Sequence, residues 1–366
     1  MNKRSCFFAL ILLGAIADAG MAMDVIHTNK GQISGEIVAS DTVRVDCKQS
    51  TGDQVKQIPV NEILCIDYTG DILGLKAVRQ DALAGRYAKA LASLEKIKSA
   101  AERAEVNQDV AFYKALCAAK LALGGTGEID EAGSLMQAFV KDNPTSYHFF
   151  EATEVIGDLL AEKKLYAKAE QYYSQLEKAP WPDYKMRAGV AIGRLLLQQG
   201  KLQEATAAFD KAMAIEGGNK SSQIQRMSAY LGKAEVLIAA KKPIEAANLI
   251  ETFLRKAAGE NAPLQNAASG DKDVAAAKGI LENPPLMAKA YNIRGTAERQ
   301  AGHNIAAVLD FLHVDLQYST VPDAHAEALA NLVDLWGELH RPDRADAARK
   351  TLKEKYPQSR WCKDGK

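Results

Sequence analysis

Histidines and cysteines are the residues of this sequence best able to hold a metal ion or move a proton, and both are scattered. Of the six histidines, His313 and His325 fall in one predicted helix junction. Their spacing suits neither one face of a helix nor a standard zinc site, and a surface or capping role is the alternative. No HExxH, GxSxG or GxxxxGKS/T motif is present, nor a GxGxxG after a predicted strand. We therefore expect no catalytic residue, no metal, no cofactor and no enzyme activity.

Two of the cysteines lie close enough in the sequence to form a disulfide bond within one segment. Cys47 and Cys65 lie in one short β-rich segment, whereas Cys117 and Cys362 lie far along the chain. None forms a CxxC pair or a metal-ligand spacing with histidine. A disulfide between Cys47 and Cys65 is one interpretation, and two buried thiols are the other.

Residues 1–22 have the pattern of a secretory signal peptide. Lys3 and Arg4 form a basic start, residues 7–16 are apolar, and small residues at 17–19 or 20–22 offer a cleavage site. The alternative is an uncleaved membrane anchor, although the apolar run is shorter than the roughly 20 residues that a spanning helix needs. Cys6 precedes the apolar run, so no lipid anchor is expected. We predict an exported, periplasmic or extracytoplasmic protein without a membrane span.

Composition favours a helical array and disfavours nucleic acid as a partner. The chain has 366 residues, a formal net charge of zero, and 11 prolines against 26 glycines. Zero net charge gives no general attraction to phosphate backbones or anionic lipid. An alanine-rich chain with few prolines is typical of helices, and this length fits a small domain followed by an extended repeat array.

In residues 23–69 apolar side chains alternate with polar ones with a period of two. This alternation predicts β-strands. The alternation runs through Ile33, Ile37, Val43, Val45, Cys47, Ile58, Val60, Ile63 and Ile66. Turn residues stand at 29–31 and 50–53. This strand and turn rhythm resembles a small SH3-like or Sm-like barrel. RNA binding, which Sm-like barrels often imply, is disfavoured by export and by the acidic residues of the segment.

Glycine, alanine and an aromatic residue then recur in a fixed frame, which indicates an array of helical hairpins. Three segments carry the full frame: Gly157/Ala169/Tyr173, Gly193/Ala205/Phe209 and Gly295/Ala307/Phe311. The frame continues with substitutions at Ala90/Leu94, Ala132/Met136, Ala246/Ile250 and Ala345/Arg349. Small residues let two helices approach closely, and the larger side chain fills the gap against the next hairpin. About seven hairpins are predicted over residues 70–362.

The first turn of each second helix is predicted from residues three positions before the frame alanine. These residues are Tyr87, Ile129, Tyr166, Leu202, Pro243, Asn304 and Pro342. Proline is tolerated there because the first N–H groups of a helix have no partner within the helix. Pro144 and Pro357 are predicted to end two of the second helices.

This pattern resembles the tetratricopeptide repeat (TPR) superfamily, with Tyr291 to Gly295 and Trp336 as partial echoes of its signature. The resemblance implies a right-handed solenoid of helical hairpins, mainly α, preceded by the β-rich module. Residues 326–361, which include Tyr356 and Pro357, are similar to bacterial periplasmic or envelope TPR proteins. One interval is longer than the others, and an insertion is expected at 258–285, either a projecting binding element or a solvated linker.

The resemblance also implies a concave groove lined by the first helices of successive hairpins, which TPR proteins use to hold a peptide or helix. Laying the family pattern on this chain gives a set of mainly charged groove residues: Glu151, Glu154, Asp158, Glu162, Arg187, Arg194, Lys289, Asn292, Arg299, Glu327, Asp334 and Glu338. The alternative is that these are solvated helix faces. The lysine and asparagine set that clamps a C-terminal carboxylate in some TPR domains is not reproduced.

Two functions are consistent with these expectations. The first is an exported scaffold that binds envelope proteins or peptides through the groove. The second is a structural spacer or assembly component that docks through its β-rich module, and an enzyme is a remote third.

Overall fold

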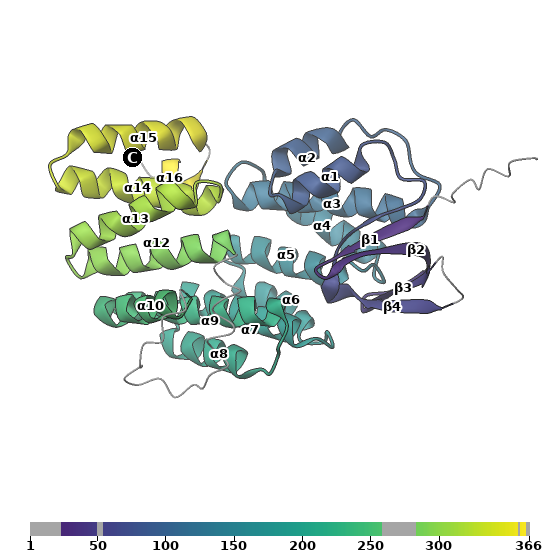
Figure 1. Ribbon diagram of the computed structural model, residues 1–366, viewed down its shortest axis with the longest axis horizontal. Helices are drawn as coiled ribbons and strands as arrows, with labels where there is room; N and C mark the ends of the chain where they lie inside the picture. The colour runs from purple at the N-terminus through teal and green to yellow at the C-terminus, as the bar shows by residue number, and fades with distance from the viewer. Residues whose placement is uncertain (1–22, 50–53, 258–282, 358, 364–366) are drawn as a thin grey trace, which may run out of the picture.

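The computed structural model describes residues 23–49, 54–257, 283–357 and 359–363 (Figure 1). The predicted signal peptide, residues 1–22, lies outside them, as does most of the predicted insertion at 258–285. The end of that insertion is placed differently, because helix α12 already begins at Pro284. No helix within the described residues is long and apolar enough to cross a membrane.

The N-terminal module is a five-stranded antiparallel sheet in the order β4-β3-β2-β1-β5. Its strands are β1 (Asp24–Thr28), β2 (Gly31–Ser40), β3 (Arg44–Gln49), β4 (Val55–Pro59) and β5 (Ile63–Asp67). A short 3-10 turn, Val60–Glu62, connects the last two strands. The final strand returns beside the first, with Ile26 opposite Ile66. Alternation with a period of two is confirmed, since Val45 and Cys47 are buried while their neighbours along β3 are more exposed.

The cysteines of this sheet are not bridged. Cys47 and Cys65 are both free thiols and both buried. Cys47 lies on β3 and Cys65 on β5, and two strands separate these in the sheet. Neighbouring strands are about 4.8 Å apart, so the two sulfurs are too far from each other within the sheet for a bond. The alternative of two buried thiols is therefore the one that the structure contains.

Thiol reactivity provides a test of this arrangement. Burial raises the pKa of Cys65 and of Cys117 to about 11, so neither thiol ionises near neutral pH. In a chain that begins at Met23, iodoacetamide at pH 8 is expected to label the half-buried Cys362 and to leave the three buried thiols intact. Mass spectrometry should find all four labelled once guanidinium is added without reductant. A pair that stays unlabelled under those conditions would contradict the free-thiol structure.

In the residues that the structure describes, seven helical hairpins follow the sheet. They are α1 (Leu75–Leu83) with α2 (Tyr87–Leu94), α3 (Ala104–Leu123) with α4 (Ile129–Asp142), α5 (Phe149–Glu162) with α6 (Tyr166–Leu176), α7 (Pro182–Gln198) with α8 (Leu202–Ala214), α9 (Lys220–Ala239) with α10 (Pro243–Ala257), α12 (Pro284–Gln300) with α13 (Asn304–Gln317), and α14 (Pro322–Glu338) with α15 (Pro342–Lys355). A four-residue helix, α16 (Arg360–Lys363), follows. All seven residues predicted to lie in the first turn of a second helix do so, and each is the first residue of its helix.

Close packing explains why glycine recurs in the first helices. A methyl group on Gly193 would lie 2.6 Å from Cε1 of Phe209, and one on Gly295 would lie 2.9 Å from Cζ of Phe311. Phe209 is fully buried and also packs against Gly232 of the following hairpin. The aromatic residue therefore joins its own hairpin to the next, as the repeat frame predicts.

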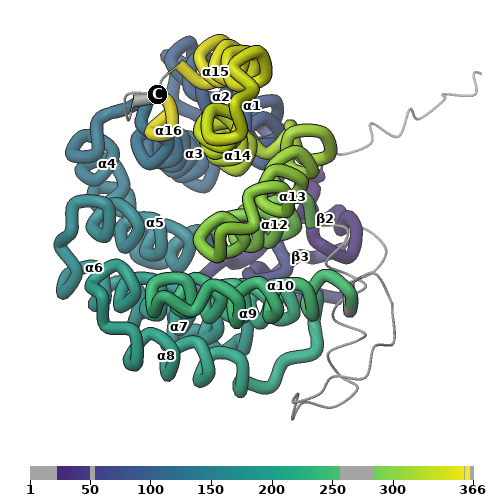
Figure 2. The backbone as a smooth tube through the Cα atoms, turned by 90° about the vertical axis from the view of Figure 1, so that its left-hand side faces the viewer, coloured from purple at the N-terminus to yellow at the C-terminus, as the bar shows by residue number. Residues whose placement is uncertain are grey.

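The hairpins wind around a common axis, which Figure 2 shows from one end. First helices such as α5, α7 and α12 lie toward the middle of the molecule, and second helices such as α6 and α8 lie further out. The sheet belongs to the same body, because one apolar core runs from Ile26 of β1 into α5. Asn61 of the 3-10 turn also donates a hydrogen bond to Asp183 of α7 at 3.0 Å.

Candidate functional site

Successive first helices carry a line of polar side chains, which we call the inner row. Its members are Glu151, Glu154 and Asp158 of α5, Arg187 and Arg194 of α7, Glu235 of α9, Lys289 and Asn292 of α12, and Glu327 of α14. Within each helix they stand three, four or seven residues apart, so each set lies on one face. Glu162 continues the α5 face by one more turn and is exposed.

Glu154 and Arg187 join α5 to α7. Their side chains form an ion pair, and they are 21% and 24% exposed. The Arg187 guanidinium also lies 4.7 Å from the centre of the Tyr184 ring, which is a cation–π contact. Burial works against the charge of Arg187, but Glu154 outweighs it and the pKa is raised. The Arg187 guanidinium is thus positioned by both the Glu154 carboxylate and the Tyr184 ring.

Arg194 is different, because it has no such pair within the described residues. Its Nε is enclosed and has no hydrogen-bond partner there. Lys289 of α12 is close enough to be affected, since burial and then the Arg194 charge lower the pKa of its ammonium. Glu235 pairs with Lys289 at 3.0 Å. Glu235 was not predicted from the sequence. Its ion pair with Lys289 links α9 to α12 within the inner row.

Asn292 does not have the predicted role. It is only 1% exposed and donates hydrogen bonds to the Ala324 carbonyl at 2.9 Å and to Glu327 at 3.0 Å. A buried amide with these bonds positions Glu327 and does not lie open to a partner. Burial raises the pKa of Glu327 to about 7, and the hydrogen bond from Asn292 opposes the rise.

Arg299 and Asp334 lie together, in a cluster nearer the carboxyl ends of α12 and α14. Arg299 reaches Glu338 at 2.6 Å, Asp334 at 3.4 Å and Asn331 at 3.3 Å. These groups satisfy one another and are partly exposed, so their contribution to stability is small. They join two first helices and form the far end of the charged surface.

Asp158 is, like Glu327, a carboxyl group of the inner row whose pKa is raised. Burial raises its pKa to about 6, and repulsion from Glu154 adds to the rise. It accepts a hydrogen bond from the Tyr173 hydroxyl at 2.9 Å. A carboxyl group with this pKa is mostly ionised at neutral pH and mostly protonated at pH 5.

The Asp158 shift predicts a pH dependence of stability. Because the folded-state pKa is above the unfolded value, the contribution of this group is fully present below about pH 4 and is lost as the pH rises through 6. Asp158→Asn keeps a hydrogen-bond acceptor for Tyr173 and removes the charge. We expect it to stabilise the fold by about 1–3 kcal/mol at pH 8 and by much less at pH 5. Urea unfolding at both pH values measures this, and an equal effect at both would contradict the shift.

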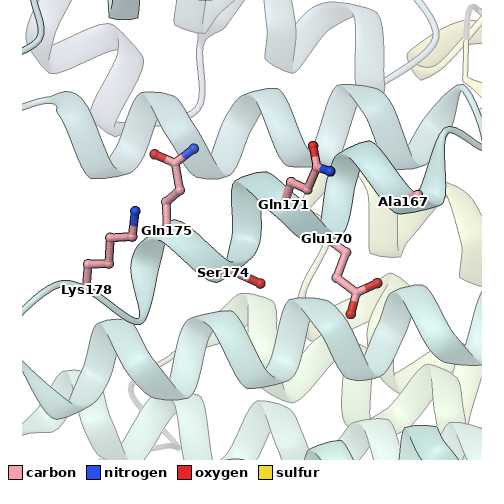
Figure 3. Close-up of a pocket in the computed structure, with 6 residues that line it drawn as sticks. All are labelled: Ala167, Glu170, Gln171, Ser174, Gln175 and Lys178. Carbon is pink, nitrogen blue, oxygen red and sulfur yellow. The ribbon is translucent and has the colours of Figure 1, made fainter.

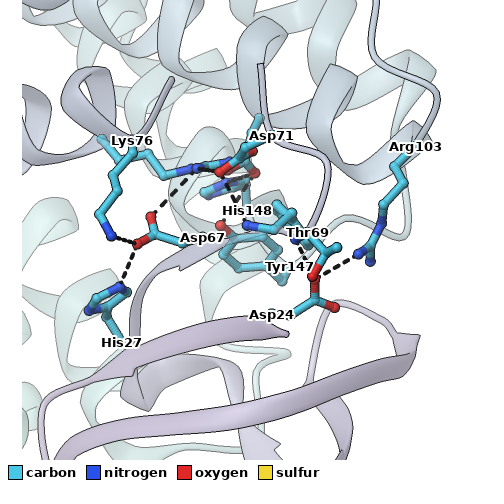
Figure 4. A network of polar contacts seen from close by, with 12 residues as sticks. Asp24, His27, Asp67, Thr69, Asp71, Lys76, Arg103, Tyr147 and His148 are labelled. Atoms are coloured by element: carbon cyan, nitrogen blue, oxygen red, sulfur yellow. Dashed lines mark hydrogen bonds and ion pairs between the residues drawn. The ribbon is translucent and has the colours of Figure 1, made fainter. Parts of the chain in front are cut away.

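A second polar cluster lies between the sheet and the helices (Figure 4). Arg79 of α1 is fully buried and binds Asp71 at 2.5 Å and Asp109 of α3 at 2.7 Å. Asp109 also accepts from His148 at 3.1 Å. Burial disfavours the charged form of His148, but hydrogen bonds to Asp109 and Glu151 outweigh it and raise the pKa. No sequence pattern predicted this cluster, which we call the junction network.

Three residues at the edge of the junction network could form a metal site by residue type. His27, Cys65 and Asp67 place their ligand atoms within 4.8 Å of one another. Asp67, however, already pairs with Lys76 and with His27, each at 2.9 Å (Figure 4). The Cys65 thiol is protonated, because burial raises its pKa to about 11. A second cation beside Lys76 would be repelled, so these residues fit an ion-pair cluster better than a metal centre.

The surface also has a pocket of about 490 Å³ along α6. It is lined by Ala167, Glu170, Gln171, Ser174, Gln175 and Lys178 (Figure 3). All six belong to one outer helix and the residues just after it, so no groups converge on it from different elements. It therefore offers no arrangement for catalysis, and we assign it no function.

Comparison with known proteins concerns the fold. No protein family model matches this chain, and no curated protein sequence matches it. A solved Rap protein, described as complexed with competence and sporulation factor, is similar with a TM-score of 0.51 and 13% identity over 80% of this chain and 75% of that one. MamA has a TM-score of 0.35 and 21% identity over 50% of this chain and 99% of that one. YrrB, described as a TPR protein with an unusual peptide-binding site, has a TM-score of 0.32 and 14% identity over 62% and 95%.

At 13% identity the similarity to the Rap protein is one of architecture, and it covers most of both chains. It agrees with the array of helical hairpins described above. This chain therefore has the fold of the tetratricopeptide repeat superfamily, preceded by a five-stranded sheet.

Proposed function

We propose that this chain is a non-enzymatic scaffold that holds a partner protein or peptide along the inner surface of its solenoid. The observation that carries the proposal is the inner row, where partly exposed charges from several first helices line one surface. Paired charges such as Glu154 and Arg187 would orient a partner. Arg194 of α7 adds a further positive charge to this surface.

The comparison supports a binding role by analogy only. The similar Rap protein is described as bound to competence and sporulation factor. A shared fold does not transfer the ligand, because function lies in the particular side chains that a fold presents. The chemistry of the partner therefore has to be inferred from the charges of this chain's own inner row.

Export to the cell envelope is the second part of the proposal. It is supported by Lys3, Arg4 and the apolar run at 7–16, followed by small residues suited to cleavage. Expression of the full chain in a bacterium tests it. We expect osmotic shock to release a product whose mass corresponds to a start near Met23. An unprocessed chain that stays inside the cell would contradict export.

Affinity capture with matched variants tests the binding role. The chain from Met23 onward is immobilised and exposed to envelope extract from its own source. Arg194→Glu and Glu162→Lys reverse charges on the inner surface, and each is expected to reduce the captured partner at least tenfold. Lys350→Glu is the control, because Lys350 is 75% exposed on the outer helix α15.

Capture that is unchanged by both inner variants, with folding verified by circular dichroism, would contradict the proposed surface. Loss of capture with Lys350→Glu alone would move the binding site to the outer helices. Docking through the β-rich module is less well supported, because the Asp24–Arg103 ion pair and the Asn61–Asp183 bond join the sheet to the solenoid.

A further inference from the structure

We infer that two copies of this chain pair through α13, whose exposed face carries an aliphatic stripe formed by Ile305, Leu309, Leu312 and Leu316. We call these four residues the α13 stripe. The two α13 helices of the dimer run antiparallel around a two-fold axis. This inference goes beyond the proposed scaffold role, because none of the four residues belongs to the inner row.

The α13 stripe is both apolar and open to solvent. Ile305, Leu309 and Leu316 are 63%, 62% and 72% exposed. Leu312 is partly buried, because it also packs against the core of its own hairpins. Successive members of the stripe stand four, three and four residues apart, so all four lie on one face of the helix. This is the spacing of the apolar positions that form the seam of a coiled coil.

The face of α13 that packs within the solenoid is a different one. The helix lies against α12 and α14 (Figure 1), and Ala307, Val308, Phe311 and Val314 are its buried apolar residues. It is therefore apolar on two faces, and only one of these is covered within the described residues. A helix that is apolar on more than one face is normally buried on each of them. A second covering partner is thus expected for the α13 stripe.

Comparison with other second helices shows that this exposed face is unusual. The solvent faces of α6, α8 and α15 carry exposed charged residues, such as Glu170, Lys211 and Lys350. The exposed residues of α13 are instead three members of the stripe and Gln317. Charged residues are the usual content of a helix face that stays in water. The composition of α13 therefore indicates a contact surface.

The charges of α13 disfavour a lipid surface and a charged partner. The helix contains no lysine or arginine, which helices on anionic membranes carry. Its two acids are already paired, Asp310 with Arg294 at 2.5 Å and Asp315 with His325 at 2.7 Å. His313, the residue after Leu312, is neutral at pH 7, because burial lowers its pKa. The α13 stripe therefore suits an uncharged apolar helix.

The symmetry of the spacing selects a second copy as that helix. Four, three and four residues read the same in both directions, so two antiparallel stripes match at every position. Ile305 then packs against Leu316 of the second copy, and Leu309 packs against its Leu312. A two-fold interface requires such a self-complementary surface. The formal net charge of the chain is zero, so no general repulsion opposes the pairing.

The size of the α13 stripe indicates a weak dimer. A stable interface buries about 800 Å² on each partner. Four side chains on one helix supply only part of this area, so we expect a dissociation constant in the micromolar range. The dimer should therefore depend on protein concentration.

Sedimentation velocity of the chain from Met23 onward, at about 1 to 200 µM, tests the pairing. The wild type is expected to shift from monomer toward dimer as the concentration rises. Leu309→Glu puts a charge at the centre of the seam and should raise the dissociation constant about tenfold or more. Leu73→Glu is the matched control, because Leu73 is 96% exposed in the loop before α1. This variant should dimerise as the wild type does.

Cysteine pairs test the antiparallel arrangement. Ile305→Cys and Leu316→Cys are made separately in a Cys362→Ser background, since the other three described thiols are buried. Under mild oxidation a mixture of the two variants is expected to give a disulfide-linked dimer. Either variant alone should not, because eleven helical residues separate the two positions by about 16 Å.

Three results would each overturn the inference. They are a wild type that stays monomeric at about 200 µM, a dimer that Leu309→Glu leaves unchanged, and linked dimers from Ile305→Cys alone. A monomeric wild type that sediments with phosphatidylglycerol vesicles, and loses this with Leu309→Glu, would assign the stripe to a lipid surface instead. Each of these results leaves the scaffold proposal intact, because none of the variants changes the inner row.

Discussion

Replacing Arg79 with methionine is expected to lower the free energy of unfolding by about 3–5 kcal/mol, among the largest effects of any single substitution in this chain. Arg79 is fully buried and satisfies the carboxylates of Asp71 and Asp109. Methionine fills a similar volume but leaves both acids near or within the core without their cation. Two uncompensated carboxylates must then be protonated or hydrated, and either requires the junction network to open.

Urea unfolding of the chain from Met23 onward measures this loss, and thermal unfolding by circular dichroism verifies it. The matched control is Arg86→Met, because Arg86 also pairs with an aspartate, at 2.6 Å from Asp81, yet its own side chain is 55% exposed. That substitution is expected to cost less than about 1 kcal/mol. Equal effects at the two arginines would mean that burial of the Arg79 ion pairs does not increase their contribution to stability.

Truncating Phe209 to alanine is expected to cost about 3–5 kcal/mol, for a different reason. Its ring is fully buried and packs against Gly193 in its own hairpin and Gly232 in the next. Removing the ring leaves a cavity at an interface between repeats, where both glycines lack side chains that could fill it. The loss should therefore weaken the coupling between neighbouring hairpins as well as one hairpin alone.

Leu316→Ala is the control for this truncation, since Leu316 is 72% exposed on α13. It should change stability by no more than about 0.5 kcal/mol. Unfolding of Phe209→Ala is expected to become broader, because repeat arrays lose cooperativity when an interface is weakened. A loss below about 1 kcal/mol for Phe209→Ala would mean that the glycine and aromatic frame does not carry the repeat packing.

The helical hairpins and their glycine–aromatic contacts were predictable because each repeat places the same residue types at the same spacing. Phe209 and Phe311 pack on the glycines that stand sixteen positions before them, as the frame predicts. Helix starts such as Pro243 and Pro342 are local, since proline fixes the first turn whatever lies around it. Local chemistry of this kind depends little on the rest of the chain.

The contacts within the site were less predictable, because they depend on how hairpins approach one another. Spacing places Asn292 on the inner face of α12, but only the approach of α14 buries it under Glu327. Glu235 was missed for the same reason, since its partner Lys289 lies on another hairpin. The junction network joins Arg79 to a residue thirty positions away, and no periodicity marks such a pair.

The β-rich module is packed onto the first hairpins and is not a separate docking domain. Its core is continuous with that of the first hairpins, and Arg103 of the loop before α3 reaches Asp24 of β1 at 2.7 Å. Asp24 also accepts from the Thr69 backbone at 2.7 Å. The module therefore covers the first end of the solenoid. Its removal would expose apolar core residues of the first hairpins to solvent.

Photo-cross-linking from defined positions tests the central claim, partner binding on the inner surface, most directly. A photoreactive residue is placed at Glu162, on the inner face of α5, and at Lys350, on the outer helix α15. Both side chains are exposed, so neither substitution should disturb the fold. Irradiation of cells that produce each variant is expected to give a discrete cross-linked partner from Glu162 and none from Lys350. A partner captured from Lys350 and not from Glu162 would contradict the account.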